Sequence, residues 1–382
     1  LVTGVQTCAL PICRDDWGNW FGCNNSNPLW HYALEERYLR RNPHLVPPNA
    51  IVTVGGNAGA ARVFPASATF ARFNDPHGFN HFTSACSPAI YRDDLLGADV
   101  AGNIFVCEPV HNLVHREQVS AVGASFIGER AAGEKASEFF TSADLWSRFT
   151  AARAGPDGAL YIADMYRLVI EHPQWIPAEW QKRIGDLRAG EDKGRIYRVR
   201  AKGVPLRAVP RLDRADAAGL IAALESPSGV VRDLAQQQLA WRQERGAASG
   251  LERLAVDSTR AATRVQALWA LEGIGALKPA VVARAMDDGH PGVRRQAVRL
   301  SETWVTRAPE LLAAVVAKVA DADASVRLQV GYTLGEWKEP AAGEALARLL
   351  RHETDRFVKA AALSSALPHS ETLMAALQRE GG

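Results

Sequence analysis

The second half of the chain carries a helical pattern of apolar positions that recurs at a nearly constant interval. From about Pro205 onward, alanine, leucine, valine and arginine dominate, and apolar residues follow the three- and four-residue spacing of amphipathic helices. One basic residue marks each copy of the pattern: Arg232, Arg264, Arg294, Arg327 and Lys359. Successive members of this set lie 32, 30, 33 and 32 residues apart. Each period has room for two helices of about ten to fourteen residues.

Short polar breaks separate the copies, as in the segments 287–291 and 321–325. One helix pair cannot bury its apolar face alone, whereas a stack of neighbouring pairs can. The pattern therefore predicts a HEAT-like α-solenoid of about five repeats over residues 204–382. We expect each basic residue to stay near the turn between repeats and to bond a neighbouring aspartate or carbonyl, which is a structural role.

Residues 13–203 carry a different pattern, in which short β-type runs alternate with turn residues. The runs are Ala50–Gly55, Ala85–Arg92, Asn103–Cys107, Leu113–Val119, Ala159–Ala163 and Arg195–Arg200. Two of these runs belong to slightly longer stretches, Gly102–Glu108 and Gly158–Asp164, that share one pattern. The pattern reads glycine, any residue, aliphatic, aromatic, β-branched, small, carboxylate. This internal repeat indicates equivalent strands in neighbouring structural units.

The two copies of the internal repeat begin 56 residues apart, and the segment 165–193 is an insertion after the second. Strand–turn–strand units at such an interval are typical of β-propeller blades. A blade takes roughly 40–50 residues, so residues 13–203 have room for about four blades at most. A closed propeller usually has more. The sequence therefore predicts a β plus α chain in which the C-terminal part of a β-propeller precedes the α-solenoid.

Composition and charge exclude several classes of protein. The 382 residues are 47% hydrophobic and 23% charged, which is ordinary for a globular protein. Lys and Arg number 44 against 42 Asp and Glu, so the chain lacks the basic surplus of a nucleic-acid binder. The sequence contains neither an apolar run of about 18 residues nor a Cys-x-x-Cys-His motif. These absences exclude a transmembrane helix and a c-type haem attachment site within this sequence.

The first twelve residues differ from the rest of the chain. Leu1–Ile12 has neither the basic start nor the apolar core of a signal peptide. It reads like the translation of a common sequencing adapter, so we interpret residues 1–12 as an artefact and begin the fold at residue 13. The alternative is a genuine but unusual N-terminus.

Three motifs resemble those of a known family. They are Phe21–His31, Phe105–Arg116 and Gly155–Arg167. They resemble a group of large membrane-bound dehydrogenases that are abundant in planctomycetes and verrucomicrobia. In that family a propeller similar to sorbosone and glucose dehydrogenases precedes HEAT-like repeats and a c-type cytochrome. The resemblance implies that this chain is a fragment without the first blades and without the cytochrome.

The resemblance also implies an activity. The parent protein would be a secreted or periplasmic oxidoreductase that oxidises a sugar or an alcohol and passes electrons to haem c in the missing cytochrome. By the same resemblance, the propeller would hold a quinone cofactor with calcium. We expect this fragment alone to be inactive, with no cofactor attached within the chain.

Candidate chemistry lies where the repeated strands end. Glu108 and Asp164 close the two copies, so we expect them to point from the same end of neighbouring blades. The candidate catalytic residues are Glu108, Asp164, His111 and His172. The candidate substrate- or cofactor-binding residues are Asn112, Tyr166, Arg167 and Glu171. The resemblance makes His111 or His172 the base that takes a proton from the substrate. The open alternative is that the two carboxylates cap strand ends by accepting N–H bonds from turns.

Two other side-chain patterns bear on chemistry and compartment. If the strands around Cys86 and Cys107 pair as an antiparallel hairpin, the two cysteines lie opposite each other, within reach of a disulfide. Such a bridge fits an oxidising compartment, and buried reduced thiols are the alternative. His111 and His115 are four residues apart, but Pro109 disfavours the helix that would aim both at zinc. We therefore expect no metal ligands among them.

The sequence leaves two main functions open. The first is the oxidoreductase fragment with a small-molecule sugar or alcohol as substrate. The alternative is a non-catalytic propeller–HEAT interaction scaffold that binds a protein partner on the HEAT surface. A third hypothesis is a HEAT-repeat lyase that acts on a bilin chromophore. It is disfavoured because it gives no role to the β part, residues 13–203. Convergence of Glu108 and Asp164 with a histidine would favour the enzyme.

Overall fold

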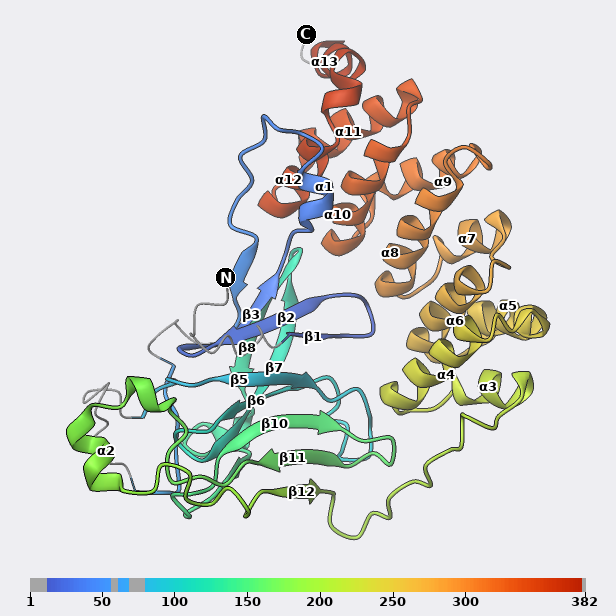
Figure 1. The fold of residues 1–382 in the computed structure, drawn as a ribbon. Helices are drawn as coiled ribbons and strands as arrows, with labels where there is room; N and C mark the ends of the chain where they lie inside the picture. The colour runs from blue at the N-terminus through green and yellow to red at the C-terminus, as the bar shows by residue number, and fades with distance from the viewer. Residues whose placement is uncertain (1–11, 56–60, 69–79, 380–382) are drawn as a thin grey trace.

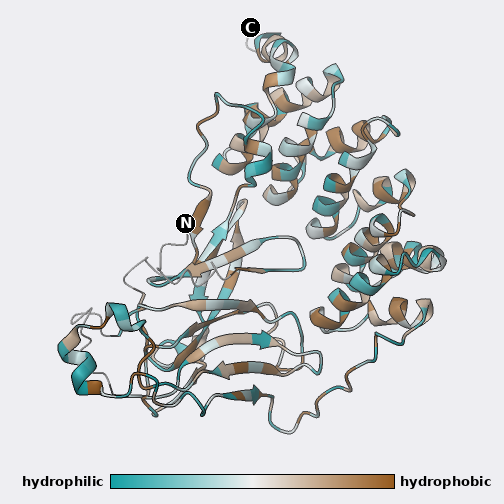
Figure 2. Cartoon of the chain, viewed as in Figure 1, coloured by the Kyte–Doolittle hydropathy of each residue, from teal (hydrophilic) through white to brown (hydrophobic). Residues whose placement is uncertain are grey.

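The computed structural model describes residues 12–55, 61–68 and 80–379. Antiparallel sheets form the first part, and a curved stack of helices forms the second (Figure 1). Hydrophobic residues run along the strands and helices of both parts (Figure 2). Residues 1–11 lie outside the described residues, so the adapter interpretation stays a prediction. The first strand begins at Ile12.

The strands form three antiparallel sheets. The first sheet has the order β1 (Ile12–Arg14), β2 (Trp20–Asn24), β3 (Asn27–Tyr32), β4 (Ile51–Thr53). The second has the order β5 (Cys86–Ile90), β6 (Ile104–Glu108), β7 (Leu113–Val122), β8 (Ser125–Arg130), and β9 (Phe140–Thr141) also pairs with β7. The third has the order β10 (Phe149–Ala154), β11 (Leu160–Asp164), β12 (Arg195–Val199). Consecutive strands are therefore neighbours in the first and third sheets and from β5 to β8 in the second.

The internal repeat of the sequence corresponds to equivalent strands. β6 and β11 each lie second in their sheet, and each ends at the carboxylate of the repeat. The glycine that opens each copy has a positive φ, +79° at Gly102 and +88° at Gly158, in the turn before the strand. Glycine adopts this conformation without strain, which explains why both turns use it.

Apolar side chains fill the spaces between the sheets. Phe21, Leu29 and Ile104 are fully buried between the first and second sheets. Phe105, Phe149 and other residues form a second cluster between the second and third. The chain is a mixed sheet and helix structure. All three sheets are open in the described residues, so the propeller stays a prediction.

Two short helices lie within the first part, α1 (Glu36–Leu39) and α2 (Ala178–Ile184). The solenoid contains two layers. One layer comprises α3 (Ala217–Ala223), α5 (Ala248–Asp257), α7 (Pro279–Ala285), α9 (Leu311–Ala317), α11 (Pro340–His352) and α13 (Ser370–Arg379). The other comprises α4 (Gly229–Trp241), α6 (Ala261–Gly273), α8 (Pro291–Leu300), α10 (Ala324–Thr333) and α12 (Arg356–Ser364). We call the second layer the inner helices, because it faces the sheets (Figure 1).

Each inner helix begins close to one of the basic residues that mark the repeat. Side chains and prolines start these helices: Asp323 accepts N–H bonds at the start of α10, Asp355 does so for α12, and Pro291 is the first residue of α8. The helical periodicity of the sequence is thus confirmed. No helix among the described residues has the length and apolar character needed to cross a membrane.

Three of the marker arginines join successive repeats through paired hydrogen bonds. The pairs are Arg264–Asp288, Arg294–Asp321 and Arg327–Glu353, with N–O distances of 2.7 to 3.3 Å. Each guanidinium also donates to a carbonyl of the preceding turn, as Arg264 does to Ser258 at 2.7 Å. These contacts confirm the structural role expected from the sequence. We call the three pairs the arginine ladder.

Candidate functional site

Glu108 and Asp164 occupy equivalent places and make equivalent contacts. Both are almost completely buried at the ends of β6 and β11. Glu108 accepts the backbone N–H of Ser84 at 2.8 Å, just before β5, and Asp164 accepts that of Arg148 at 2.7 Å, just before β10. Each carboxylate therefore fixes the start of the preceding strand, as the strand-capping alternative expects.

His111 is the one candidate base that lies beside a candidate carboxylate. Its Nδ1 is 3.3 Å from Oε1 of Glu108, and both side chains are buried. Asn112 follows with a positive φ of +56°, accepts a hydrogen bond from Ser67 and donates to the carbonyl of Ser147. The side chain of Asn112 thus joins the turn between β6 and β7 to the loop that contains Ser67 and to the segment just before β10.

The buried guanidinium of Arg148 connects the loops after β6 and β11. It donates to the carbonyls of Pro109 at 3.1 Å, Arg167 at 3.0 Å and Leu168 at 2.8 Å. The loops that follow the two strands therefore meet at this arginine. Main-chain carbonyls satisfy the arginine that joins them, so this junction is a structural core of polar contacts.

The remaining candidates do not gather around Glu108. Tyr166 packs its ring under the guanidinium of Arg195, with 4.1 Å to the ring centroid, and Arg167 donates to carbonyls of its own loop. His172 is exposed and accepts the N–H of Gln174 at 3.3 Å, and Glu171 beside it is half-buried. Among the described residues, His172 contacts neither strand-end carboxylate. Its role as a base stays a prediction.

The cysteines lie as the antiparallel hairpin predicted. Cys86 in β5 is directly opposite Cys107 in β6. Both are thiols in this structure, and the Cys86 Sγ donates to the carbonyl of Thr150 at 3.6 Å. Burial raises the pKa of the Cys107 thiol well above its ordinary value, so it is a poor nucleophile as it stands. The disulfide, and the oxidising compartment it would suit, stay predictions.

A buried ionic cluster that the sequence did not reveal surrounds His115. Its two ring nitrogens contact carboxylates, Glu138 at 2.9 Å and Glu117 at 3.1 Å, and Arg130 bonds Glu138 at 2.8 Å. Burial favours the neutral ring of His115, but the hydrogen bonds and charges of Glu117 and Glu138 outweigh this effect, so the pKa of His115 is raised above its ordinary value. Across the described residues, no three His, Cys, Asp or Glu side chains are grouped so as to hold a metal.

The turn between β1 and β2 is inserted against the inner helices. Asp16 accepts hydrogen bonds from Arg92 at 3.0 Å and from Arg232, the first marker arginine, at 2.8 Å. Arg232 is 2% exposed and also bonds Gln266. Burial favours the protonated carboxyl of Asp16, but the charges of Arg92 and Arg232 outweigh this effect, so the pKa of Asp16 lies below its ordinary value. Here a residue of the sheets takes the place of an acidic partner in the ladder.

The same turn continues along α8. Trp17 stacks on His290 with ring centroids 4.1 Å apart, and its carbonyl accepts a hydrogen bond from Gln296 at 2.7 Å. Asn19 accepts a hydrogen bond from the buried Arg295. The turn is thus fixed by aromatic and polar contacts along its length.

A second contact lies around α1. The rings of Tyr38 and Tyr332 are stacked, with centroids 4.3 Å apart, and the Tyr38 hydroxyl donates to Glu302 at 2.9 Å. Burial raises the pKa of both Tyr38 and Glu302. Ala33 and Leu34 join the apolar core of the solenoid. Residues of the first part therefore join the solenoid core, while the sheets keep separate cores of their own, and the chain itself covers part of the inner face.

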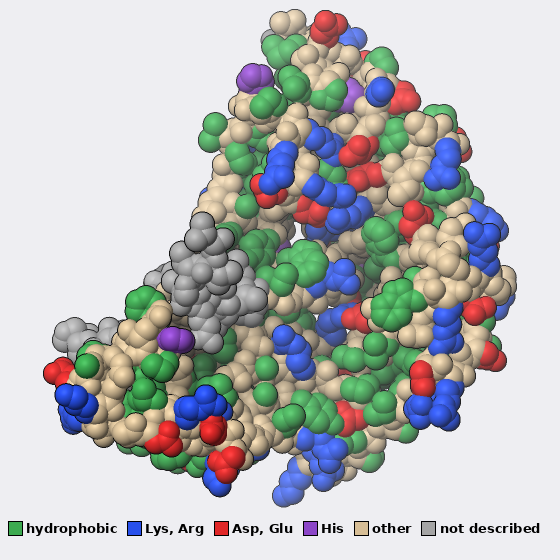
Figure 3. All heavy atoms as spheres, viewed as in Figure 1, with side chains coloured by type: hydrophobic (Ala, Val, Ile, Leu, Met, Phe, Trp, Pro, Cys, Tyr) green, Lys and Arg blue, Asp and Glu red, His purple; other side chains and the backbone are tan. Residues whose placement is uncertain are grey.

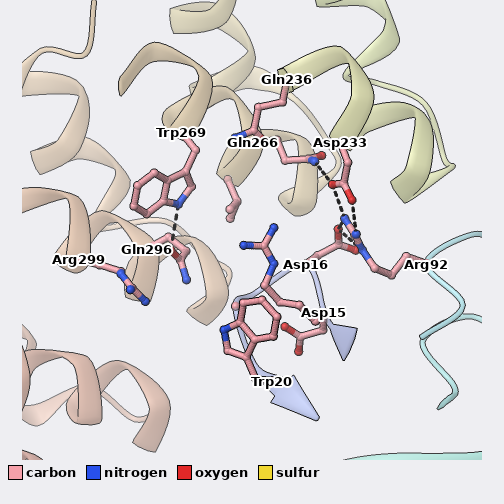
Figure 4. A pocket seen from close by; sticks show the side chains of 13 residues that line it. Asp15, Asp16, Trp20, Arg92, Asp233, Gln236, Gln266, Trp269, Gln296 and Arg299 are labelled. Carbon is pink, nitrogen blue, oxygen red and sulfur yellow. Dashed lines mark hydrogen bonds and ion pairs between the residues drawn. The ribbon is translucent and has the colours of Figure 1, made fainter. Parts of the chain in front are cut away.

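A polar pocket of about 270 Å³ lies beside the contact between the β1–β2 turn and the inner helices (Figure 4). Trp269 and Arg299 from the helices face Asp15 and Trp20 from the sheets across it. Burial raises the pKa of Asp15. The face seen in Figure 3 is hollowed between sheets and helices, with basic and hydrophobic side chains in the hollow.

The first inner helix, α4, exposes a position that is buried in the next three inner helices. Leu234 lies two residues after its marker arginine and is 42% exposed. The residues at the same position in the next three inner helices are buried: Gln266, Gln296 and Gln329. Trp241, seven residues after Leu234 and on the same side of α4, is 70% exposed. We call Leu234 and Trp241 the α4 face.

Comparison with protein families places the first part of the chain. A family model described as "Domain of unknown function (DUF7133)" matches residues 2–203, which is more than half of the chain. The chain belongs to the DUF7133 family. A model for HEAT repeats matches residues 278–366, which lie within the solenoid of this DUF7133 chain. The match confirms the repeat region predicted from the sequence. No curated protein matches the chain significantly.

Two solved structures are similar to part of the DUF7133 chain. A designed armadillo repeat protein in complex with a (KR)4 peptide is 17% identical with a TM-score of 0.31, and the match covers 43% of this chain and 91% of that one. An engineered protein from a structural genomics consortium is 16% identical with a TM-score of 0.29, and the match covers 44% of this chain and 98% of that one. At these TM-scores neither likeness bears on function.

The sequence did not reveal how the DUF7133 sheets bind the solenoid. Asp16, Trp17 and Tyr38 have no periodic spacing, and each finds its partner more than 200 residues away. The spacing of the marker residues gave no signal either, because Asp257 lies 25 residues after Arg232, within the 24 to 27 residues that separate the other three arginines from their acidic partners.

Proposed function

We propose that this DUF7133 chain is a protein-interaction scaffold whose HEAT solenoid binds a protein partner through the α4 face. HEAT repeats over residues 278–366 support an interaction surface of the solenoid type. The observation that carries the proposal is the exposure of Leu234, at a position that is buried in the next three inner helices, beside the exposed Trp241. An exposed tryptophan beside an exposed leucine is the side-chain chemistry of an interface anchor.

The surroundings of the α4 face suit a segment of protein. An anchor contributes most when polar groups around it exclude water after binding. Asp233 and Gln236 of the same helix line the neighbouring polar pocket, together with Arg14 of β1. A partner that places an apolar side chain against Trp241 could therefore also form hydrogen bonds in the pocket.

The proposal predicts that the α4 face decides binding. A library of displayed peptides is selected on the full chain, and the affinity of a selected peptide is measured by fluorescence anisotropy. Trp241→Ala should weaken binding about 30-fold, because an anchor tryptophan contributes on the order of 2 kcal/mol. The variant should fold normally, because Trp241 is 70% exposed.

Trp175 provides the matched control. It is 56% exposed and lies in the insertion after β11, on the sheet part of the chain. Trp175→Ala should leave the affinity of the selected peptide unchanged. Peptides that bind the Trp241 variant as tightly as the original chain would overturn the proposal.

The oxidoreductase expected from the resemblance has no support in the matched families or proteins. The propeller, the sugar or alcohol substrate, haem c, the quinone with calcium, electron transfer and the periplasmic location all stay predictions. His111 beside Glu108 is the pair such an enzyme could use, but the other contacts of Glu108 and Asp164 serve to hold strands.

A further inference from the structure

The third sheet has an open edge. Its strands are β10, β11 and β12, whereas the first sheet has four strands and the second has five. β12 pairs with β11 through all five of its residues, and no described strand lies on its other side. An edge strand of this kind presents unpaired backbone N–H and C=O groups that can accept another strand.

The segment 193–202 is basic: it carries Lys193, Arg195, Arg198, Arg200 and Lys202, and it contains no acidic residue. Nearby carboxylates pair with the first two, Asp192 with Lys193 and Asp164 and Asp144 with Arg195, so the charge that faces a partner comes from Arg198, Arg200 and Lys202. The side chain of Arg198 is 55% exposed, and its contact with Asp157 is a long one of 4.0 Å. Charges on an edge strand protect against pairing with identical strands. The same charges attract an acidic strand.

The two faces of β12 differ as an added strand requires. Tyr197 and Val199 are half-buried against the core between the second and third sheets. Ile196, on the opposite face, is 72% exposed among the arginines. A fourth strand would extend the apolar cover beside Tyr197 and Val199, and it would place side chains next to Ile196.

We propose that β12 binds an extended acidic segment of a partner protein, which adds to the third sheet as a fourth strand. A second copy of β12 does not fit, because two such strands would place their arginines side by side. The site is separate from the α4 face, so variants of one leave the other intact. It gives the scaffold a second binding surface of different chemistry.

The experiment uses the full chain and a labelled, capped peptide of alternating valine and glutamate as the probe. Binding is measured by fluorescence anisotropy. The double variant Arg198→Glu, Arg200→Glu should bind about tenfold more weakly, because each exposed ion pair contributes a few-fold. The matched control is Arg253→Glu, Arg284→Glu, which makes the same charge change on exposed positions of α5 and α7. The control should bind like the original chain.

A second probe separates strand addition from simple charge attraction. The same peptide with every amide N-methylated keeps its glutamates but has no N–H to donate, so it should not bind. Equal binding of the two peptides, equal loss in both double variants, or no binding of the first peptide to the original chain would each overturn the proposal. The first peptide should also bind the Trp241→Ala variant as tightly as the original chain. This result is expected whether or not the α4 face binds a partner.

Discussion

Asp16→Ala is expected to destabilise the chain by about 3 kcal/mol. The substitution leaves Arg232, which is 2% exposed, with one charge partner fewer in a buried setting. It also removes a partner of Arg92, whose other carboxylate is Asp233. Breaking one side of a buried ion pair costs more than the pair itself contributes, because the remaining charge stays desolvated. Urea unfolding followed by circular dichroism measures the change.

Asp213→Ala is the control for this prediction. Asp213 also pairs with an arginine, Arg211, but both side chains are more than half exposed. An exposed pair contributes little, so unfolding of this variant should match that of the original chain. Equal stability of the Asp16 variant and the original chain would contradict the account of the interface between sheets and solenoid.

Arg294→Gln is expected to destabilise the solenoid by about 2 kcal/mol at neutral pH, and the loss should shrink in acid. Arg294 and Asp321 form a ladder pair whose side chains are 16% and 6% exposed. Burial opposes ionisation of Asp321, but the hydrogen bond and charge of Arg294 outweigh it and keep its pKa below the ordinary value.

The sign of the pH effect follows from that lowered pKa. A carboxyl with a lower pKa in the folded state than in the unfolded state stabilises the fold above its unfolded pKa, about 4. The contribution is lost as the pH falls through the folded value. Free energies of unfolding at pH 7, 5 and 3 test this. A cost of Arg294→Gln that is the same at all three pH values would contradict the role of the ion pair.

The solenoid could be predicted because its signals are local and repeated. Marker arginines at a nearly constant interval fixed the number of inner helices, and the turn that each arginine contacts lies within six residues of it. Cys86 and Cys107 lie opposite each other as the hairpin predicted, although the pairing shifts by one residue at an irregularity between Cys86 and Ala89, which the sequence did not reveal.

The contacts between the two parts could not be predicted in this way. Asp16 and Arg232 are separated by 216 residues, and nothing in the spacing of either residue refers to the other. The strand-end carboxylates show a different limit. The sequence placed Glu108 and Asp164 at equivalent ends, but a carboxylate that caps a strand and one that takes part in catalysis look alike in sequence. The structure adds the backbone N–H groups that donate to each carboxylate, which are the contacts of a strand cap, and the catalytic role stays a prediction.

The most direct test of the scaffold is amide hydrogen exchange of the full chain with and without a display-selected peptide. The account predicts slower exchange in α4, Gly229–Trp241, and unchanged exchange in the loops that follow β6 and β11. Slower exchange in those two loops, around His111 and Tyr166, with α4 unchanged, would contradict it and would direct attention back to the strand ends as the binding site.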